Sequence, residues 1–327
     1  MHIFMCSSIA NDIGEKGASA LAEALEINTS LQNLDISDNH ILSNGAISLA
    51  KVLKMNVSLQ SLNLQHNRIA DDGASAIAEA LKMNTNLQNL NLAFNYIGDK
   101  GIGALVESLK TNRSLQNLDL SCILNICRNK AYHNFSFEPC AYFIFSFIAT
   151  DITTLGISVL AEVLKLNTSL HVLDIGYNNI TDDGASILAE VLKINTNLQN
   201  LDISTNDITK KSASALAEAL KMNTSLQILN IEYNDITNDG ASALAEALKI
   251  NTTLRNLNLN YNDIGDKGAI ALAEALKMNT SLQNLDLIKN NLGEKGASAL
   301  AEVQIVNKSL TIIIFKLKPF YIFFCQK

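Results

Sequence analysis

Three cysteines and a histidine in one short segment are the residues of this 327-residue chain that most resemble a metal site. Cys122, Cys127, His133 and Cys140 offer thiolate and imidazole groups, the ligands that zinc prefers in proteins. Structural zinc sites usually draw their cysteines from CxxC pairs, and this segment contains no such pair. We therefore expect no metal and no other cofactor.

Two glycine-rich stretches, GDKGIG at 98–103 and GEKGAS at 14–19, resemble phosphate-binding loops only superficially. A P-loop requires GxxxxGK followed by Ser or Thr, and neither stretch fits. We expect both to be turns that enter helices. The histidines lie at unrelated positions, so no nucleophile, base and orienting group come together. The sequence indicates a protein that is not an enzyme.

Composition excludes several other classes of protein. The formal charge is -7 without clustered Lys and Arg, which argues against nucleic acid or an anionic membrane as a partner. No apolar run approaches the length of a membrane helix, and the first ten residues do not form a secretory signal. The five cysteines fall outside the regular sequence pattern, so we expect no disulfide framework and a soluble, cytoplasmic protein.

The regular pattern is an internal repeat with a period of about 28 residues. A leucine that opens the same short phrase marks each repeat, with the period intact on both sides of one interruption. The ten leucines are Leu31, Leu59, Leu87, Leu115, Leu170, Leu198, Leu226, Leu254, Leu282 and Leu310.

The first half of each repeat reads LxxLxLxxN, as in Leu254, Leu257, Leu259 and Asn262. The alternation predicts a short strand with one buried face. We expect the closing Asn to be buried and to hydrogen-bond the backbone of the turn. This predicts a ladder of asparagines that runs along the array.

The second half reads GAxxLAxxL, as in Gly73, Ala74, Ile77, Ala78 and Leu81, and predicts an amphipathic helix with one solvated face. Each helix ends at an asparagine, a residue that tolerates the left-handed backbone of a helix C-cap. Since this role accounts for all of them, we expect those that form glycosylation sequons to be structural. They are Asn28, Asn56, Asn84, Asn112, Asn167, Asn195, Asn223, Asn251, Asn279 and Asn307.

A strand-turn-helix unit cannot bury its apolar face alone, so the repeats must stack. Stacked helices are wider than stacked strands, which predicts an α/β solenoid shaped as a horseshoe, with a parallel sheet on the concave face and helices on the convex face. From about Ile9 to Phe315 the chain resembles the ribonuclease-inhibitor-like leucine-rich-repeat family. The resemblance implies this fold, and it implies function only weakly because family members bind unrelated partners through their exposed positions.

The repeats define the expected organisation of the chain. Residues 1–121 and 151–315 are leucine-rich repeats with a degenerate first unit, 122–150 are a non-repeat insertion, and 316–327 are a hydrophobic tail. The insertion is either an elaborated loop or a translated non-coding segment such as a retained intron. We favour the second, because excision of the extra residues restores a regular unit. We expect a final strand with Leu310, Ile313 and Phe315 in register, and the chain to be a fragment of a longer protein.

Two columns of exposed strand positions are the candidate partner-binding surface. One lies between the buried strand residues and is acidic or amide: Asp35, Asn63, Asn91, Asp119, Asp174, Asp202, Asn230, Asn258 and Asp286. The other precedes the ladder Asn: Asp38, His66, Phe94, Cys122, Tyr177, Thr205, Tyr233, Tyr261 and Lys289.

Tyrosines beside carboxylates are typical of interface hot spots. The residues expected to bind a partner are Phe94, Tyr177, Tyr233, Tyr261, Glu232, Asp119, Asp174, Asp202 and Asp286. A solvated polar face explains the first column as well as binding does, and local packing explains the second as well.

These features favour a non-enzymatic scaffold that binds a protein partner with a basic surface. The family resemblance implies two alternatives. One is a GTPase-activating protein for a small Ran-like GTPase, and the other is the detached sensor region of a nucleotide-binding immune receptor.

Overall fold

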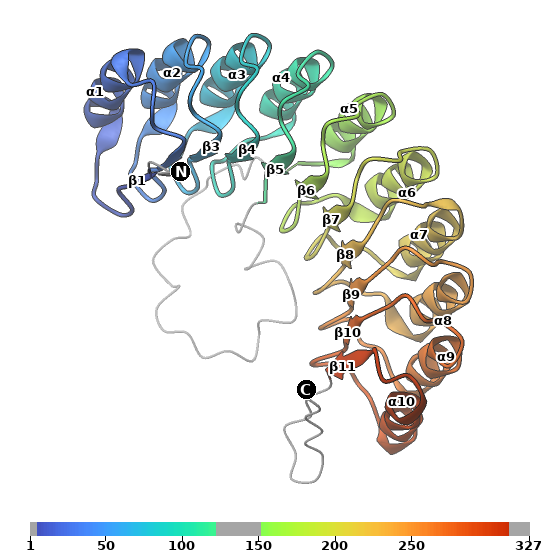
Figure 1. Cartoon of the computed structure of the whole chain (residues 1–327). Coiled ribbons are helices and arrows are strands. Elements are labelled where there is room, and N and C mark those ends of the chain that lie inside the picture. The colour runs from blue at the N-terminus through green and yellow to red at the C-terminus, as the bar shows by residue number, and fades with distance from the viewer. Residues whose placement is uncertain (1–4, 122–151, 314–327) are drawn as a thin grey trace. The chain divides into compact units, whose positions relative to one another are not determined.

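The computed structural model describes residues 5–121 and 152–313 (Figure 1). The chain divides into two compact units. Unit 1 comprises residues 1–115, 119–156 and 177–179, and unit 2 comprises residues 116–118, 157–176 and 180–327. The insertion at 122–150, the tail at 316–327 and the residues Cys122, Cys127, His133 and Cys140 lie outside the described residues.

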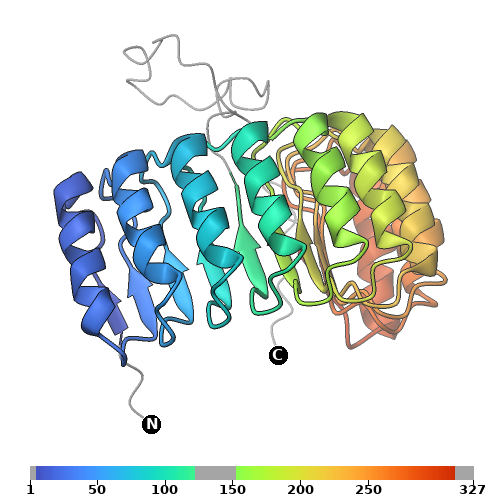
Figure 2. The same cartoon turned by 90° about the horizontal axis from the view of Figure 1, so that it is seen from above.

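Unit 1 alternates short strands with helices, and its first four strands pair in parallel in chain order. In Figure 2 its helices lie side by side in one layer. The strands are β1 (Met5–Ser7), β2 (Asn33–Asp35), β3 (Ser61–Asn63) and β4 (Asn89–Asn91). The helices are α1 (Gly14–Ile27), α2 (Leu42–Leu53), α3 (Ala70–Leu81) and α4 (Asp99–Leu109).

Unit 2 repeats this arrangement, with its strands on the inner side of the bend and its helices on the outer side (Figure 1). The strands from β6 onward pair in parallel in chain order. They are β6 (Val172–Asp174), β7 (Asn200–Asp202), β8 (Ile228–Asn230), β9 (Asn256–Asn258), β10 (Asn284–Asp286) and β11 (Thr311–Ile313). The helices are α6 (Thr181–Leu192), α7 (Lys210–Met222), α8 (Thr237–Leu248), α9 (Asp266–Leu276) and α10 (Glu294–Val306). Strand β5 (Asn117–Asp119) and helix α5 (Thr154–Leu164) each contain a boundary between the units.

The regular alternation of parallel strands and helices, one of each per sequence repeat, confirms the predicted α/β solenoid. The core lies between the two layers, where Leu257 of β9 and Leu244 of α8 are almost fully buried. Small residues bring neighbouring helices close together. A side chain on Gly240 would meet the Cβ of Ala213 at 2.7 Å, so this position requires glycine.

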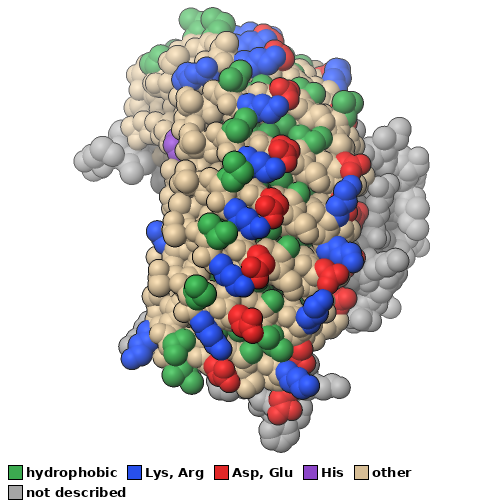
Figure 3. All heavy atoms as spheres, turned by 90° about the vertical axis from the view of Figure 1, so that its right-hand side faces the viewer, with side chains coloured by type: hydrophobic (Ala, Val, Ile, Leu, Met, Phe, Trp, Pro, Cys, Tyr) green, Lys and Arg blue, Asp and Glu red, His purple; other side chains and the backbone are tan. Residues whose placement is uncertain are grey.

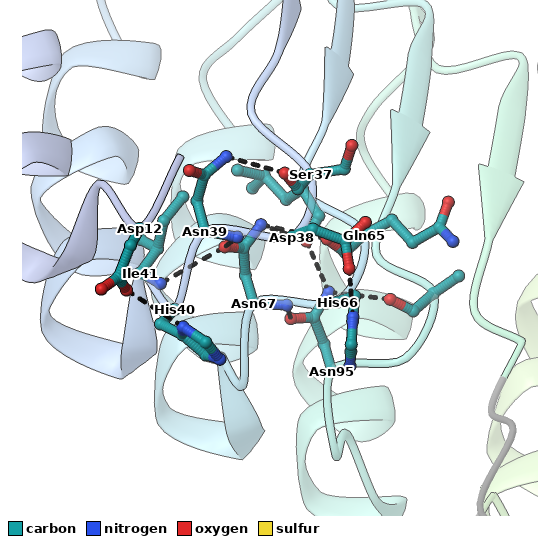
Figure 4. Close-up of polar contacts among 12 residues, drawn as sticks. Asp12, Ser37, Asp38, Asn39, His40, Ile41, Gln65, His66, Asn67 and Asn95 are labelled. Carbon is teal, nitrogen blue, oxygen red and sulfur yellow. Dashed lines mark hydrogen bonds and ion pairs between the residues drawn. The ribbon is translucent and has the colours of Figure 1, made fainter. Parts of the chain in front are cut away.

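The predicted asparagine ladder is confirmed (Figure 4). Asn67 is fully buried, and its Nδ2 donates to the carbonyl of Ile36 in the preceding repeat at 2.9 Å. Its Oδ1 accepts from the backbone N–H groups of Asn39 at 2.9 Å and Ile41 at 3.3 Å. The side chain therefore satisfies backbone groups that would otherwise be buried without partners, which is costly.

The left-handed conformation expected for the helix-end asparagines is wrong. Asn223 is extended, with φ -72° and ψ 133°, and none of the ten asparagines has a positive φ. Its Nδ2 donates to the carbonyl of Leu192 in the preceding repeat at 2.7 Å, while its Oδ1 accepts from the N–H of Leu226 at 2.7 Å. The extended backbone lets one side chain bridge two repeats. This second ladder occupies the amide nitrogen and supports a structural role for the sequons.

The register expected for the last strand is also wrong. Ile312, and not Ile313, pairs with Leu285 of β10, and Ile312 is 7% exposed. The reason lies in the preceding turn. In the repeat before, Oδ1 of Asn279 accepts from the N–H of Leu282 at 2.8 Å, whereas the N–H of Leu310 donates to the backbone carbonyl of Asn307 at 3.3 Å. Without the side-chain bond, the step from position 285 to position 312 is one position shorter than the step from 257 to 285.

The residues on both sides of the insertion keep the geometry of a regular repeat. Nδ2 of Asn178 donates to the carbonyl of Leu120 at 3.3 Å, and its Oδ1 accepts from the N–H of Ile152 at 3.1 Å. In a regular repeat the first of these bonds spans 31 residues, and here it spans 58, an excess of 27. Across the described ranges, no helix is long and apolar enough to cross a membrane.

Candidate protein-binding surface

The exposed side of the strands of unit 2 is the surface that the sequence singles out. In β7 to β9 the middle residue is buried, and the first and third residues are partly exposed on the other side. The third residues form the acidic and amide column, of which Asp202, Asn230, Asn258 and Asp286 lie on neighbouring strands.

Each residue of this column caps the turn that follows its own strand. Oδ1 of Asp202 accepts from the N–H of Ser204 at 2.9 Å, and Oδ1 of Asn258 accepts from the N–H of Asn260 at 3.0 Å. Such a turn requires Asp or Asn but does not choose between them. The turn does not use the second polar atom of the side chain. In Asn230 this atom is Nδ2, which donates to Oδ2 of Asp202 at 2.5 Å. The turn therefore explains why Asp or Asn occupies these positions, but it does not explain the choice of Asp over Asn.

Glu232 lies just beyond β8 and adds a half-buried carboxylate to the column. Burial raises its pKa, and the nearby charges of Asp286 and Asp202 raise it further, against the opposite effect of a hydrogen bond from Asn258. That bond joins Nδ2 of Asn258 to Oε2 of Glu232 at 2.8 Å. Within the described residues, none of the three carboxylates forms an ion pair, so unit 2 presents concentrated negative charge at this place.

The aromatic column lies beside this charge. The rings of Tyr233 and Tyr261 stack with centroids 3.8 Å apart and planes at 13°. The contact is nearly face to face and joins consecutive repeats. The stack supports the packing interpretation for the facing sides of the rings.

Every described member of this column has a left-handed backbone, a feature that the sequence reasoning missed. The φ angles at Tyr233 and Tyr261 are 51° and 53°. Bulky side chains at positive φ are unusual, because they cost roughly 1–2 kcal/mol per residue relative to the ordinary backbone. Asn or Gly would relieve the strain.

The other predicted residues are not all brought to this place. Phe94, Asp119 and Tyr177 belong to unit 1, so they do not add to the surface described for unit 2. Asp174 belongs to unit 2 and caps its own turn by accepting from the N–H of Gly176 at 2.9 Å. Thr205 follows Tyr177 in the column and is 2% exposed, so it interrupts the aromatic run.

Two histidines of unit 1 pair with aspartates one repeat earlier (Figure 4). Nδ1 of His40 lies 3.1 Å from Oδ1 of Asp12, and His66 pairs in the same way with Asp38, the preceding member of its own column. These side chains are largely exposed, and exposed pairs contribute little to stability. Among the described residues no group of three or more His, Cys, Asp or Glu side chains is arranged to hold a metal ion.

A row of exposed apolar side chains on the helix layer was also not predicted from the sequence. It carried a visible signal, since an apolar residue stands between Lys and the helix-end Asn in most repeats, as in Met222 and Ile250. Both side chains are more than half exposed.

Comparison with known sequences agrees with this architecture. The model of the family described as Leucine Rich repeat matches eight segments of the chain. They are 28–50, 56–78, 84–106, 166–189, 195–217, 223–245, 251–273 and 279–301. No curated protein matches the chain.

Solved structures show a looser likeness. Among 182 matching chains is one titled Leiomodin-1 Actin-Binding Site 2 (ABS2), which is 26% identical with a TM-score of 0.37. The alignment covers 45% of this chain and 87% of that one. A TM-score at this level gives no information about partner or function.

Proposed function

Since the chain belongs to the leucine-rich repeat family, we propose that it is a non-enzymatic scaffold whose strand surface in unit 2 binds a basic segment of a protein partner. The observation that carries the proposal is Glu232 between Asp202 and Asp286, beside the Tyr233–Tyr261 stack. In the part of the chain that the structure describes, these three carboxylates have no cation partner. A partner arginine or lysine supplies the missing charge.

Arginine suits this surface best. Its planar guanidinium donates two parallel hydrogen bonds to a carboxylate and also stacks on aromatic faces. The facing sides of Tyr233 and Tyr261 cover each other, so we place the cation–π contact on the face of the Tyr261 ring that is turned away from Tyr233. A cation beside Glu232 also favours its ionised form, which burial disfavours. Binding therefore supplies the positive charge that these three carboxylates lack in the described part of the chain.

Charge-neutral variants test this proposal without disturbing the turns. The triple variant Asp202→Asn, Glu232→Gln and Asp286→Asn leaves one acceptor oxygen at each position, and Asn230 and Asn258 already show that Asn caps these turns. At Asp202 the second oxygen, which accepts from Nδ2 of Asn230, becomes a donor. The matched control is Asp207→Asn, Asp235→Asn and Asp263→Asn, three exposed aspartates in consecutive repeats of unit 2. Both variants change the net charge equally.

The measurement is binding of arginine-containing and lysine-containing peptides, followed by fluorescence polarisation. We expect the strand-surface variant to lose at least tenfold in affinity, or about 1.4 kcal/mol, and the control to retain binding. Replacement of Tyr233 and Tyr261 by Ser should also weaken binding. Equal losses in both charge variants would show that only net charge matters, and undiminished binding in the strand-surface variant would refute the proposal.

A further inference from the structure

Arg255 is a partly exposed cation at the end of the strand surface of unit 2 that lies away from the carboxylates. It stands directly before β9, whose last residue is Asn258. Nδ2 of Asn258 donates to Oε2 of Glu232 at 2.8 Å and so holds that carboxylate at the other end of the same strand. Three residues separate Arg255 from Asn258, about 10 Å at the rise of a parallel strand. The surface therefore carries opposite charges at the two ends of one strand.

The fold does not require arginine at this position. The equivalent residues in the neighbouring repeats of unit 2 are Gln199, Gln227 and Gln283. The N–H of Arg255 donates to the carbonyl of Gln227 at 2.7 Å, and the N–H of Gln283 donates to the carbonyl of Arg255 at 2.7 Å. Any residue except proline can make these backbone bonds. The pairing of the repeats therefore does not explain the choice of arginine over glutamine.

The guanidinium of Arg255 is held in place without a carboxylate partner. Its Nη1 donates to the backbone carbonyl of Ser281 in the next repeat at 2.8 Å. A guanidinium has five N–H donors, so this bond leaves most of them for another acceptor. In the part of the chain that the structure describes, Arg255 forms no ion pair, and the turns at 251–256 and 279–284 contain no Asp or Glu. A side chain already fixed in this way loses less freedom when it binds an acceptor from outside.

Most lysines on the helix layer of unit 2 differ from Arg255, because an acidic side chain lies beside them. Lys221 pairs with Glu218 at 2.6 Å, and Lys249 pairs with Glu246 at 2.6 Å. Figure 3 shows blue and red side chains next to each other along these helices. Lys289 is a further exposed cation at the carboxylate end of the strand surface, where the three carboxylates outnumber it. The charge of Arg255 is therefore available at the opposite end.

The distance between the two charges selects the conformation of the partner. On a helix, residues seven apart lie on the same face, about 10.5 Å along the axis. In an extended segment, residues on the same face lie about 6.6 or 13 Å apart. The helix matches the separation of about 10 Å between Arg255 and Asn258 better than either extended spacing does.

We propose that Arg255 binds a carboxylate of the partner, so that the strand surface of unit 2 recognises a helix with a basic and an acidic residue two turns apart. This rests on the proposed function, in which the basic residue binds the carboxylates of Asp202, Glu232 and Asp286. The order of the two charges along the helix sets its direction across the strands. Without Arg255, the acidic residue of the partner meets a surface of net negative charge and is repelled.

The test compares two helical peptides that differ at one residue. One carries an arginine and a glutamate seven residues apart, and the other has glutamine in place of the glutamate. Fluorescence polarisation measures the binding of both to the full chain and to the variant Arg255→Gln. The matched control is Lys295→Gln, which removes one exposed positive charge from α10 instead. Glutamine occupies the equivalent place in neighbouring repeats, so we expect Arg255→Gln to keep the wild-type melting temperature.

We expect wild type and the Lys295→Gln control to bind the glutamate peptide about fivefold more tightly than the glutamine peptide. Arg255→Gln should reverse this preference, and Arg255→Lys should keep part of it, because lysine keeps the charge without the planar fork. Equal binding of the two peptides by wild type would overturn the proposal, as would an unchanged preference in Arg255→Gln. In both cases a glutamine peptide that still binds leaves the proposed function standing. If neither peptide binds, the proposed function fails and this inference fails with it.

Discussion

The ring of Tyr233 lies nearly parallel to the ring of Tyr261 in the next repeat, with centroids 3.8 Å apart. The pair joins consecutive repeats of unit 2 at the edge of the strand surface. The facing sides of the two rings cover each other, so the pair contributes to local packing between the repeats.

We predict that Glu232→Gln stabilises the protein at neutral pH. Burial raises the pKa of Glu232, so the folded state binds a proton more tightly than the unfolded chain does. Stability is therefore lost as pH rises from the ordinary glutamate pKa, about 4.3, through the raised value. Gln keeps the acceptor for Nδ2 of Asn258 without the charge.

The measurement for Glu232→Gln is the melting temperature of variant and wild type from pH 3.5 to pH 8, values chosen to span the glutamate titration near pH ~4.3. The two curves should coincide at the acid end, and the variant should melt higher at the neutral end. A constant difference across this range would mean that the titration of Glu232 is not its cause.

Relief of left-handed strain gives a second prediction. Lys289 is exposed and has φ 57°. Asn tolerates this backbone better than Lys, so Lys289→Asn should stabilise the protein by about 0.5–1 kcal/mol. Lys289→Ala removes the same side chain without relieving the strain and should give no gain. Urea denaturation distinguishes the two, and equal effects of Asn and Ala would contradict the interpretation.

The fold could be predicted from the sequence because burial leaves a periodic trace. Leucines such as Leu254 and Leu282 recur once in every repeat, since each fills the same site in the core. The ladder role of Asn67 followed from its place at the end of that pattern. Both depend on residue type, which the sequence shows directly.

The conformation of single residues left no such trace. Tyr233 and Tyr261 adopt a backbone that their residue type disfavours, so no propensity could indicate it. The shortened step before Ile312 depends on whether the side chain of Asn307 bonds to Leu310, and the asparagine is present in the sequence either way. The exposed apolar residues at Met222 and its counterparts are visible in the sequence, but there they look like the last turn of an amphipathic helix.

A third prediction concerns Asp182, which links α6 to α7. Its Oδ1 accepts from the N–H of Thr209 at 2.9 Å and its Oδ2 from the hydroxyl of Thr209 at 2.6 Å. Burial alone would raise its pKa, but hydrogen bonds from Ser212 and Thr209 outweigh burial and lower it. Its contribution to stability is therefore present above the unfolded pKa of about 3.9 and is lost as pH falls through the lowered value.

Asn238 guides the choice of variant, because it occupies the equivalent position two repeats later. Its Oδ1 accepts from the N–H groups of Gly265 and Gly268 at 3.0 and 2.8 Å. Asp182→Asn should thus be tolerated and should flatten the loss of stability in acid. Asp182→Ala leaves its donors unpaired and should cost about 2 kcal/mol. Chemical denaturation at neutral and acid pH measures both. An Asn variant as damaging as Ala would show that the charge itself is needed.

The last prediction concerns the insertion. Asn178 bonds to Leu120 on one side and to Ile152 on the other, as in an uninterrupted repeat. Deletion of residues 123–149 removes the additional segment and leaves Thr150 at the place of a ladder asparagine. We expect the deletion variant to fold with a melting temperature at or above that of wild type, because a shorter connection costs less chain entropy.

The change Thr150→Asn in the deletion background tests whether the register is correct. If Thr150 occupies the ladder position, the new amide can bond the neighbouring turns as Asn67 does, and it should add about 1 kcal/mol of stability. Thr150→Ala in the same background is the control and should add nothing. Loss of cooperative unfolding on deletion would instead show that residues 123–149 belong to the fold. A gain from Asn without a gain from Ala would establish that one repeat continues across the junction and that the segment is dispensable.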